Sequence, residues 1–163
     1  MPERSVILLV DDSDDDILLV QRAFRRGGVT NPLFVVNRGE EAIDYLRGEG
    51  KFGNRIEFPL PDLILLDLKM TGMDGFDVLR WLRSQPGLRA IRVIVLTSSS
   101  RIQDVNLAYS LGANSFLTKP LDFDNYIETC SALKNYWLDR DKMPEADRQP
   151  RRKPCNHHDE PEQ

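Results

Sequence analysis

Polar residues follow four apolar runs of this chain, in positions where they could take part in phosphate or metal chemistry. Asp11 and Asp12 come directly after SVILLV, and Asp67 comes directly after LILL. Thr97 ends the run RVIVLT, and Lys119 follows SFLT. A carboxylate can attack phosphorus, while a hydroxyl and an ammonium can contact the oxygens of the transferred group. These residue types therefore suit phosphoryl transfer, provided that the fold brings them together.

The apolar runs and the segments between them predict an α/β fold. Continuous apolar runs without alternation are typical of strands buried on both faces of a parallel sheet. We expect five strands, at residues 5–10, 33–36, 63–67, 92–97 and 115–118. Apolar residues at helical spacing predict five helices, at residues 14–26, 40–47, 75–84, 103–111 and 123–138, the last capped by Asp122. Strands that alternate with helices along the whole domain predict a doubly wound, five-stranded parallel sheet with helices on both faces.

One parallel sheet would place all of these polar residues at the same edge, because the carboxyl ends of its strands meet there. Unit charges about 4 Å apart interact by roughly 4 kcal/mol at an effective dielectric near 20, so clustered carboxylates repel one another unless cations lie among them. Lys119 supplies one positive charge. Carboxylates with a backbone carbonyl suit Mg²⁺, and no nearby His or Cys favours zinc. We therefore expect an acyl phosphate on Asp67 beside a magnesium ion.

Length and composition argue against several other classes of protein. The chain has 163 residues and 40% hydrophobic content, which fits one domain at residues 1–138 and a polar, flexible tail at 139–163. A net charge of −4 argues against a broad nucleic-acid surface. The two cysteines are too far apart for a disulfide framework, and the N-terminal apolar run is too short for a signal peptide or a membrane span. We expect a cytoplasmic protein with no direct nucleic-acid or membrane contact.

Several less specific features have an ordinary structural interpretation. The segment 48–61, rich in Gly, Pro and charge, is predicted to be a surface loop. Cys130 lies at helical spacing with core residues, so we interpret it as part of the core. The tail contains a basic run at 151–153 and three metal-ligating types, Cys155, His157 and His158. We interpret these as a solvated tail and not as a nucleic-acid arm or a zinc site.

In these residues and their order, the chain resembles the receiver domains of two-component response regulators. The resemblance covers residues 5–138 and rests on the acidic pair Asp11-Asp12, the aspartate at the end of the third strand, and the MDG sequence at 73–75. It also rests on Thr97 and on Lys119-Pro120. It implies a flavodoxin-like fold with strand order 2-1-3-4-5.

The resemblance also implies a role for each site residue. Asp67 would accept the phosphoryl group from a sensor histidine kinase, and Thr97 and Lys119 would contact its oxygens. Magnesium would be held by Asp11, Asp12, Asp67 and the backbone carbonyl of Lys69, with Asp11 acting largely through water. Phe116 would be the aromatic switch residue that moves with Thr97, and the Lys119-Pro120 bond would be cis. Lys69 and Ser99, two residues beyond Asp67 and Thr97, could control the approach of water to the acyl phosphate.

Within the family, the long segment 48–61 and the YWL at 136–138 resemble single-domain regulators that partner bacterial phytochrome kinases. The signal would then pass through protein contacts to another regulator, a phosphotransfer protein, the kinase itself or a homodimer. Enzymatic activity would be limited to self-phosphorylation and autodephosphorylation.

Two other functions fit parts of the pattern. A haloacid-dehalogenase-type phosphohydrolase also forms an aspartyl phosphate, but its DxDxT signature has an acid where this chain has Lys69. A docking module that works without phosphorylation is the second alternative, and the complete set of site residues argues against it.

Overall fold

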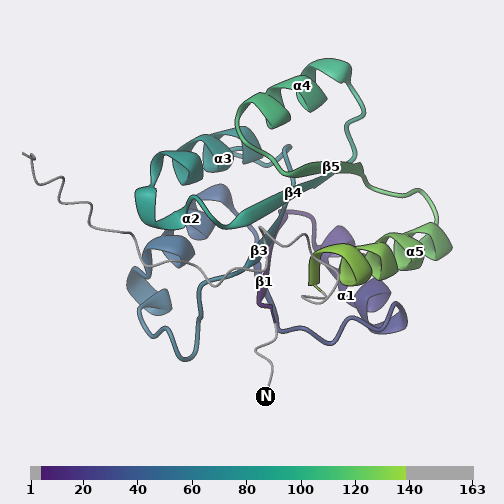
Figure 1. The fold of residues 1–163 in the computed structure, drawn as a ribbon, viewed down its shortest axis with the longest axis horizontal. Helices are drawn as coiled ribbons and strands as arrows, with labels where there is room; N and C mark the ends of the chain where they lie inside the picture. The colour runs from purple at the N-terminus through teal and green to yellow at the C-terminus, as the bar shows by residue number, and fades with distance from the viewer. Residues whose placement is uncertain (1–4, 139–163) are drawn as a thin grey trace, which may run out of the picture.

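The computed structural model describes residues 5–138, which form a five-stranded parallel sheet between two layers of helices (Figure 1). The strand order is β2-β1-β3-β4-β5, and every neighbouring pair is parallel, which confirms the predicted fold. The strands are β1 Ile7–Val10, β2 Leu33–Val36, β3 Leu63–Leu66, β4 Arg92–Thr97 and β5 Ser115–Thr118.

The helices divide between the two faces of the sheet. Helices α1 and α5 cover one face, and α2, α3 and α4 cover the other (Figure 1). Their bounds are α1 Asp14–Arg26, α2 Gly39–Arg47, α3 Gly75–Ser84, α4 Ile102–Ser110 and α5 Phe123–Leu133. Short 3-10 turns lie at Gly50–Phe52 and Pro86–Leu88.

Strand β1 shows how the two cores form. Successive side chains of a strand point to opposite faces, so Ile7 and Leu9 pack with α1 and α5 while Leu8 and Val10 pack with α2 and α3. All four residues are at most 1% exposed. A central strand buried on both faces needs an unbroken apolar sequence, which is the pattern seen in the chain.

Side-chain caps fix where three helices begin. Ser13 caps α1 by accepting the Asp16 backbone N–H at 3.3 Å. Asp74 and Asp77 form a reciprocal capping box on α3. The predicted cap Asp122 accepts the Asn125 backbone N–H at 2.8 Å. These caps supply partners for backbone N–H groups that have none within their helices.

Some predicted boundaries were wrong by a few residues. The first strand begins at Ile7 and not at residue 5, and α2 begins one residue early, at Gly39. Helix α4 runs from Ile102 to Ser110, one residue earlier than predicted. Its first residue, Ile102, is 66% exposed and does not belong to the apolar face on which the prediction was based. The last predicted helix stops at Leu133 and continues as a π-helical turn to Leu138. The predicted tail, with Cys155 and its two histidines, lies outside the described residues.

The segment 48–61 is not simply a surface loop, because it adds an aromatic cluster to the core. Phe52 is 5% exposed, and its ring centroid lies 5.0 Å from that of Tyr45 and 5.2 Å from that of Phe58. Arg55 donates to the carbonyls of Tyr45 at 2.7 Å and Leu46 at 2.8 Å, at the end of α2. The prediction was incomplete because Gly, Pro and charged residues concealed one buried and one half-buried aromatic ring and a partly buried guanidinium contact.

Among residues 5–138, no helix has the length and apolar content needed to cross a membrane.

Arg83 ties α3 to the turns that precede β4 and β5. Its guanidinium donates to the carbonyls of Gly112 at 2.8 Å, Ile91 at 2.7 Å and Arg89 at 2.9 Å, and to Asn114 Oδ1 at 3.0 Å. Burial lowers the pKa of this guanidinium, which is still far above neutral pH. One side chain thus satisfies several backbone acceptors that helices and strands leave unpaired.

Replacing Arg83 by alanine should therefore lower the free energy of unfolding by about 2–4 kcal/mol, because carbonyls in a low-dielectric site lose a charged donor. Urea denaturation followed by circular dichroism measures the change. Arg80→Ala is the matched control, since the Arg80–Asp77 pair is solvent-exposed and such pairs contribute less than about 1 kcal/mol. Equal losses in the two variants would contradict this assignment.

Candidate functional site

The carboxyl ends of the strands bring the predicted polar residues to one edge of the sheet. Backbone hydrogen bonds extend the ladders past the last strand residues: Asp67 N donates to the Val10 carbonyl at 3.0 Å, and Lys119 N to the Thr97 carbonyl at 2.7 Å. Asp11 N likewise donates to the Val36 carbonyl at 3.2 Å. The backbone at Asp11, Asp67 and Lys119 is therefore held by the sheet itself.

The Lys119 ammonium lies among three carboxylates. Its Nζ is 2.7 Å from Asp11 Oδ2, 2.8 Å from Asp16 Oδ2 and 3.0 Å from Asp67 Oδ2. The side chains of Lys119, Asp11 and Asp67 are 8%, 1% and 7% exposed. These are short charge-assisted hydrogen bonds in a largely buried site, where water screens them only weakly.

Burial and hydrogen bonding act in opposite directions on these groups. For Lys119, burial alone would lower the pKa, but the hydrogen bonds to Asp11, Asp16 and Asp67 outweigh it and raise the pKa above its usual value. For Asp11, burial raises the pKa, and the hydrogen bond from Lys119 offsets only part of that effect. Lys119 is thus positively charged at neutral pH, and burial disfavours the ionised form of Asp11.

Asp11, Asp12 and Asp67 could hold a metal ion. One carboxylate oxygen from each lies within 4.8 Å of the others. Asp12 is the exposed member, and its Oδ2 accepts the Thr71 backbone N–H at 3.0 Å. The Lys69 backbone N–H donates to Asp67 Oδ1 at 3.2 Å, which fixes the chain just past Asp67. An oxygen-only donor set with one open side suits a hard divalent cation.

Thr97 has an unpaired hydroxyl. The residue is 0% exposed, and its Oγ1 has no hydrogen-bond partner among the described residues. A buried hydroxyl without a partner loses about 1–3 kcal/mol relative to a satisfied one. A group that brought acceptor oxygens to this edge of the sheet would remove that penalty.

Phe116 lies on β5, half-buried against the core that α2, α3 and α4 cover. Its backbone N–H donates to the Tyr109 hydroxyl on α4 at 3.1 Å. Its proposed role as a switch residue stays a prediction.

Gly75, in the MDG sequence at 73–75, lies against the backbone that follows β3. A Cβ at this position would run into the Asp67 carbonyl oxygen and lie 2.8 Å from Leu68 Cα. Only glycine allows α3 to begin this close to Asp67.

One prediction for this region was wrong. The Lys119-Pro120 bond is trans, as are all peptide bonds among residues 5–138. The intrinsic preference between the two isomers before proline is only about 0.5–1 kcal/mol, so sequence alone does not decide it.

Sequence reasoning missed Asp16 as a partner of Lys119. A signal was present: Asp16 is four residues before buried Val20 and seven before buried Ala23, so it lies on the inward face of α1. An acid on an otherwise apolar stripe needs a positive partner.

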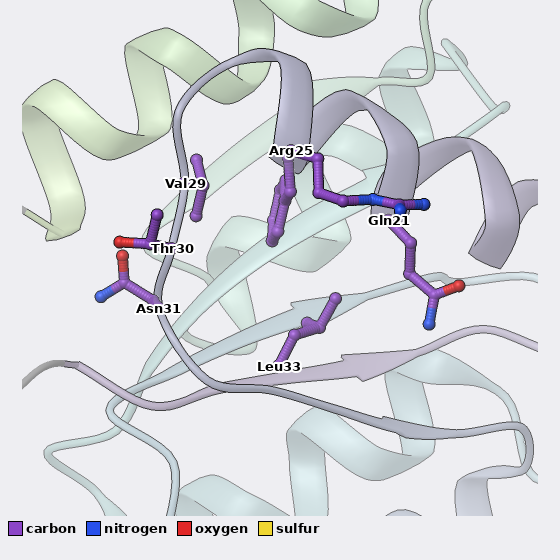
Figure 2. A pocket seen from close by; sticks show the side chains of 7 residues that line it. Gln21, Arg25, Val29, Thr30, Asn31 and Leu33 are labelled. Carbon is purple, nitrogen blue, oxygen red and sulfur yellow. The ribbon is translucent and has the colours of Figure 1, made fainter.

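Two open hollows differ in how close they lie to this edge. A hollow of about 490 Å³ adjoins the site and is lined by Asp12, Lys69, Thr71, Arg101 and Asp104, among others. Another, of about 440 Å³, lies between the C-terminal half of α1 and the start of β2, toward the opposite edge of the sheet (Figure 2). None of the predicted site residues lines this second hollow, which is bordered by Gln21, Phe24, Arg25, Val29, Thr30, Asn31 and Leu33.

A parallel sheet with two acids after β1, one after β3, a hydroxyl at the end of β4 and a lysine after β5 defines a phosphoacceptor domain of the flavodoxin-like class. Residues 7–131 match the response regulator receiver domain family. The chain belongs to this family, whose general function is to accept a phosphoryl group from a histidine kinase. Such domains are phosphoryl-accepting signalling modules, not enzymes in the usual sense. The dehalogenase-type alternative finds no support in this match.

Several relatives resemble the chain over most of their length. The probable methanogenesis regulatory protein FilR2 of Methanothrix harundinacea is 41% identical over 85% of this chain and 87% of its own. Response regulator Rcp1 of Synechocystis is 35% identical over 86% and 94%. The Mn²⁺-bound form of Rcp1 superimposes with a TM-score of 0.74, at 34% identity over 83% of this chain and 95% of that one. Phosphorylated RcpA, a cyanobacterial phytochrome response regulator, gives a TM-score of 0.75 at 34% identity over 82% and 93%.

The acidic cluster predicts that Mg²⁺ stabilises the folded protein. With about 10 mM ion and a dissociation constant of roughly 1 mM, the free energy of unfolding should rise by about 1.4 kcal/mol. Asp12→Asn should remove most of this gain, while Asp14→Asn, on the exposed first turn of α1, should keep it. Urea denaturation with and without Mg²⁺, at matched ionic strength, measures the difference. Equal gains in the two variants would show that the ion acts elsewhere.

Proposed function

We propose that this chain is a response regulator whose Asp67 accepts a phosphoryl group from the phosphohistidine of a sensor histidine kinase. The observation that carries the proposal is the pairing of Asp67 with the Lys119 ammonium, beside the Asp11 and Asp12 carboxylates. The unpaired Thr97 hydroxyl, at the neighbouring strand end, supports it.

In the proposed transfer, a carboxylate oxygen of Asp67 attacks the phosphorus atom. An O–P bond forms, the N–P bond to the imidazole breaks, and the imidazole leaves with the electron pair of that bond and takes up a proton. Lys119 offers a fixed positive charge to the phosphoryl oxygens, and Thr97 offers a hydroxyl donor. The Lys119 ammonium is preorganised by burial and by its carboxylate partners, so little reorganisation of this charge is needed during transfer.

We further propose that Asp11, Asp12, Asp67 and the Lys69 carbonyl hold Mg²⁺. The bound ion would neutralise charge on the phosphoryl oxygens. The oxygen-only cluster within 4.8 Å and the Mn²⁺-bound form of the relative Rcp1 support this assignment.

The signal would leave through a change at Thr97 and Phe116. Phosphorylation adds a group with two negative charges and strong acceptor oxygens, which would give the Thr97 hydroxyl its missing partner. The hydrogen bond between Phe116 N and Tyr109 Oη links this part of β5 to α4. Such a change would be sensed by protein partners, either a phosphotransfer protein or a second copy of this chain.

For the kinase, we propose a bacterial phytochrome. RcpA, at 34% identity, is a phytochrome response regulator, which supports this choice. FilR2, at 41% identity, is named as a methanogenesis regulator, so a kinase of another sensory class is the alternative. We place this chain and the domain of the kinase that donates the phosphoryl group in the cytoplasm, where the transfer would take place.

Asp67→Asn should abolish phosphorylation, because an amide cannot act as the nucleophile. The wild type, incubated with Mg²⁺ and a phosphorylated phytochrome kinase, should gain one phosphoryl group that hydroxylamine removes, as expected of an acyl phosphate. Intact-mass spectrometry measures this, with Asp77→Asn as the control. Hydroxylamine-stable labelling, or labelling of Asp67→Asn, would contradict the proposal. A wild type that takes no group from kinases or from acetyl phosphate would favour the docking-module alternative.

Lys69 should affect how long the acyl phosphate lasts. Its exposed side chain lines the hollow beside the site together with Arg101, on the open side through which water would approach. Lys69→Ala should shorten the lifetime by about threefold or more, a barrier change of roughly 0.7 kcal/mol. Loss of the labelled phosphoryl group with time measures the lifetime. Equal rates for the variant and the wild type would exclude a role for this side chain.

A further inference from the structure

Lys119 has a partner that comes from a helix and not from a strand end. Asp16 Oδ2 lies 2.8 Å from Lys119 Nζ, a separation between those of Asp11 and Asp67. Asp16 belongs to the first turn of α1, and its side chain is 34% exposed. It is not among the residues that the receiver resemblance assigns to the phosphoryl group or to the metal.

The three carboxylates occupy all the donors of the ammonium. A lysine ammonium has three N–H groups and no acceptor, and the structure gives it three carboxylate partners. Only Asp67 is to carry the phosphoryl group. Asp11 and Asp16 can therefore keep their bonds to Lys119 while the third N–H points toward Asp67 and whatever is bound to it.

Two fixed anchors matter because lysine is a flexible side chain. Its long stem carries about 2 kcal/mol of rotamer entropy, and a single contact leaves the ammonium free to rotate. With Asp11 on β1 and Asp16 on α1, the ammonium is held from two different elements. The direction of the remaining N–H is then set before the phosphoryl group arrives.

Tyr126, on α5, is buried near this cluster. Its ring is 3% exposed, and its hydroxyl has no hydrogen-bond partner among residues 5–138. Burial raises the pKa of this hydroxyl, and the charges of Lys119 and Asp16 are close enough to act on it as well. The Lys119 end of the Asp16–Lys119 contact is buried, with 8% of its side chain exposed, and ion pairs are stronger there than at an exposed surface.

We propose that Asp16 is a positioning residue, which holds the Lys119 ammonium against the phosphoryl oxygens during and after transfer to Asp67. The inference rests on the proposed function, because it assumes that Asp67 is the acceptor. Asp14 and Asp15 provide a comparison within the same helical turn. Both are exposed, and neither contacts Lys119. Replacing one of them therefore removes a negative charge from this turn without removing the contact to Lys119.

The test compares Asp16→Asn with Asp15→Asn, which makes the same change of charge one residue away. Each full-length variant is titrated with beryllofluoride, a mimic of the phosphoryl group, at saturating Mg²⁺ and followed by ¹⁹F NMR. Rates of phosphorylation by acetyl phosphate and Mg²⁺ affinities are measured in parallel. Asp16→Asn should weaken beryllofluoride binding and slow phosphorylation by about tenfold, the effect of one charge-assisted hydrogen bond. Its Mg²⁺ affinity should change by a smaller factor, since Asp16 lies outside the acidic cluster.

Asp15→Asn should behave as the wild type, and Asp16→Glu should recover part of the loss, because its carboxylate can still reach Lys119. Urea midpoints of all variants guard against misfolding. The proposal is overturned if Asp16→Asn matches Asp15→Asn, if it binds beryllofluoride more tightly, or if it loses Mg²⁺ and beryllofluoride affinity in the same ratio. A wild type that binds beryllofluoride but is phosphorylated by no donor would count against the proposed function alone, because the binding comparison would still decide the role of Asp16.

Discussion

The position of one ammonium group constrains the rest of this structure. Lys119 follows β5, yet its Nζ bonds to carboxylates that follow β1 and β3 and to one on α1. In this sheet β3 and β4 lie between β1 and β5, and the aligned carboxyl ends let one lysine reach acids from both β1 and β3. The sheet order and the position of α1 together give the lysine its partners. The lysine in turn makes a buried acidic cluster tolerable.

The same edge combines well-satisfied and poorly satisfied polar groups. Lys119 has a partner for every donor, whereas the Thr97 hydroxyl has none within residues 5–138, and burial disfavours the ionised form of Asp11. Such unsatisfied groups lower the stability of a resting fold and are most often retained where a ligand completes them. The site thus has a preorganised half, around Lys119, and a half that a metal ion and a phosphoryl group would complete.

The sequence predicted the strand-end residues because their position follows from one local rule. Asp11, Asp67 and Thr97 stand where apolar runs stop, and the carboxyl edge of a parallel sheet collects such residues. It did not predict features that depend on tertiary contacts. Asp16 was missed because it lies within a helix and not at the end of an apolar run, and the burial of Phe52 because its neighbours in sequence are polar. The prediction of a cis Lys119-Pro120 bond was wrong because the local energy difference between the two isomers is small.

The close approach of Gly75 to the Asp67 carbonyl has a use in comparing genomes. No side chain fits between the start of α3 and the backbone after β3, so a substitution there would force these elements apart. A paralogue that keeps all its acids but has lost this glycine would have a distorted acceptor loop. Position 75 can therefore help to distinguish working copies from pseudo-receivers in newly sequenced organisms, where inspection of the charged residues alone would not.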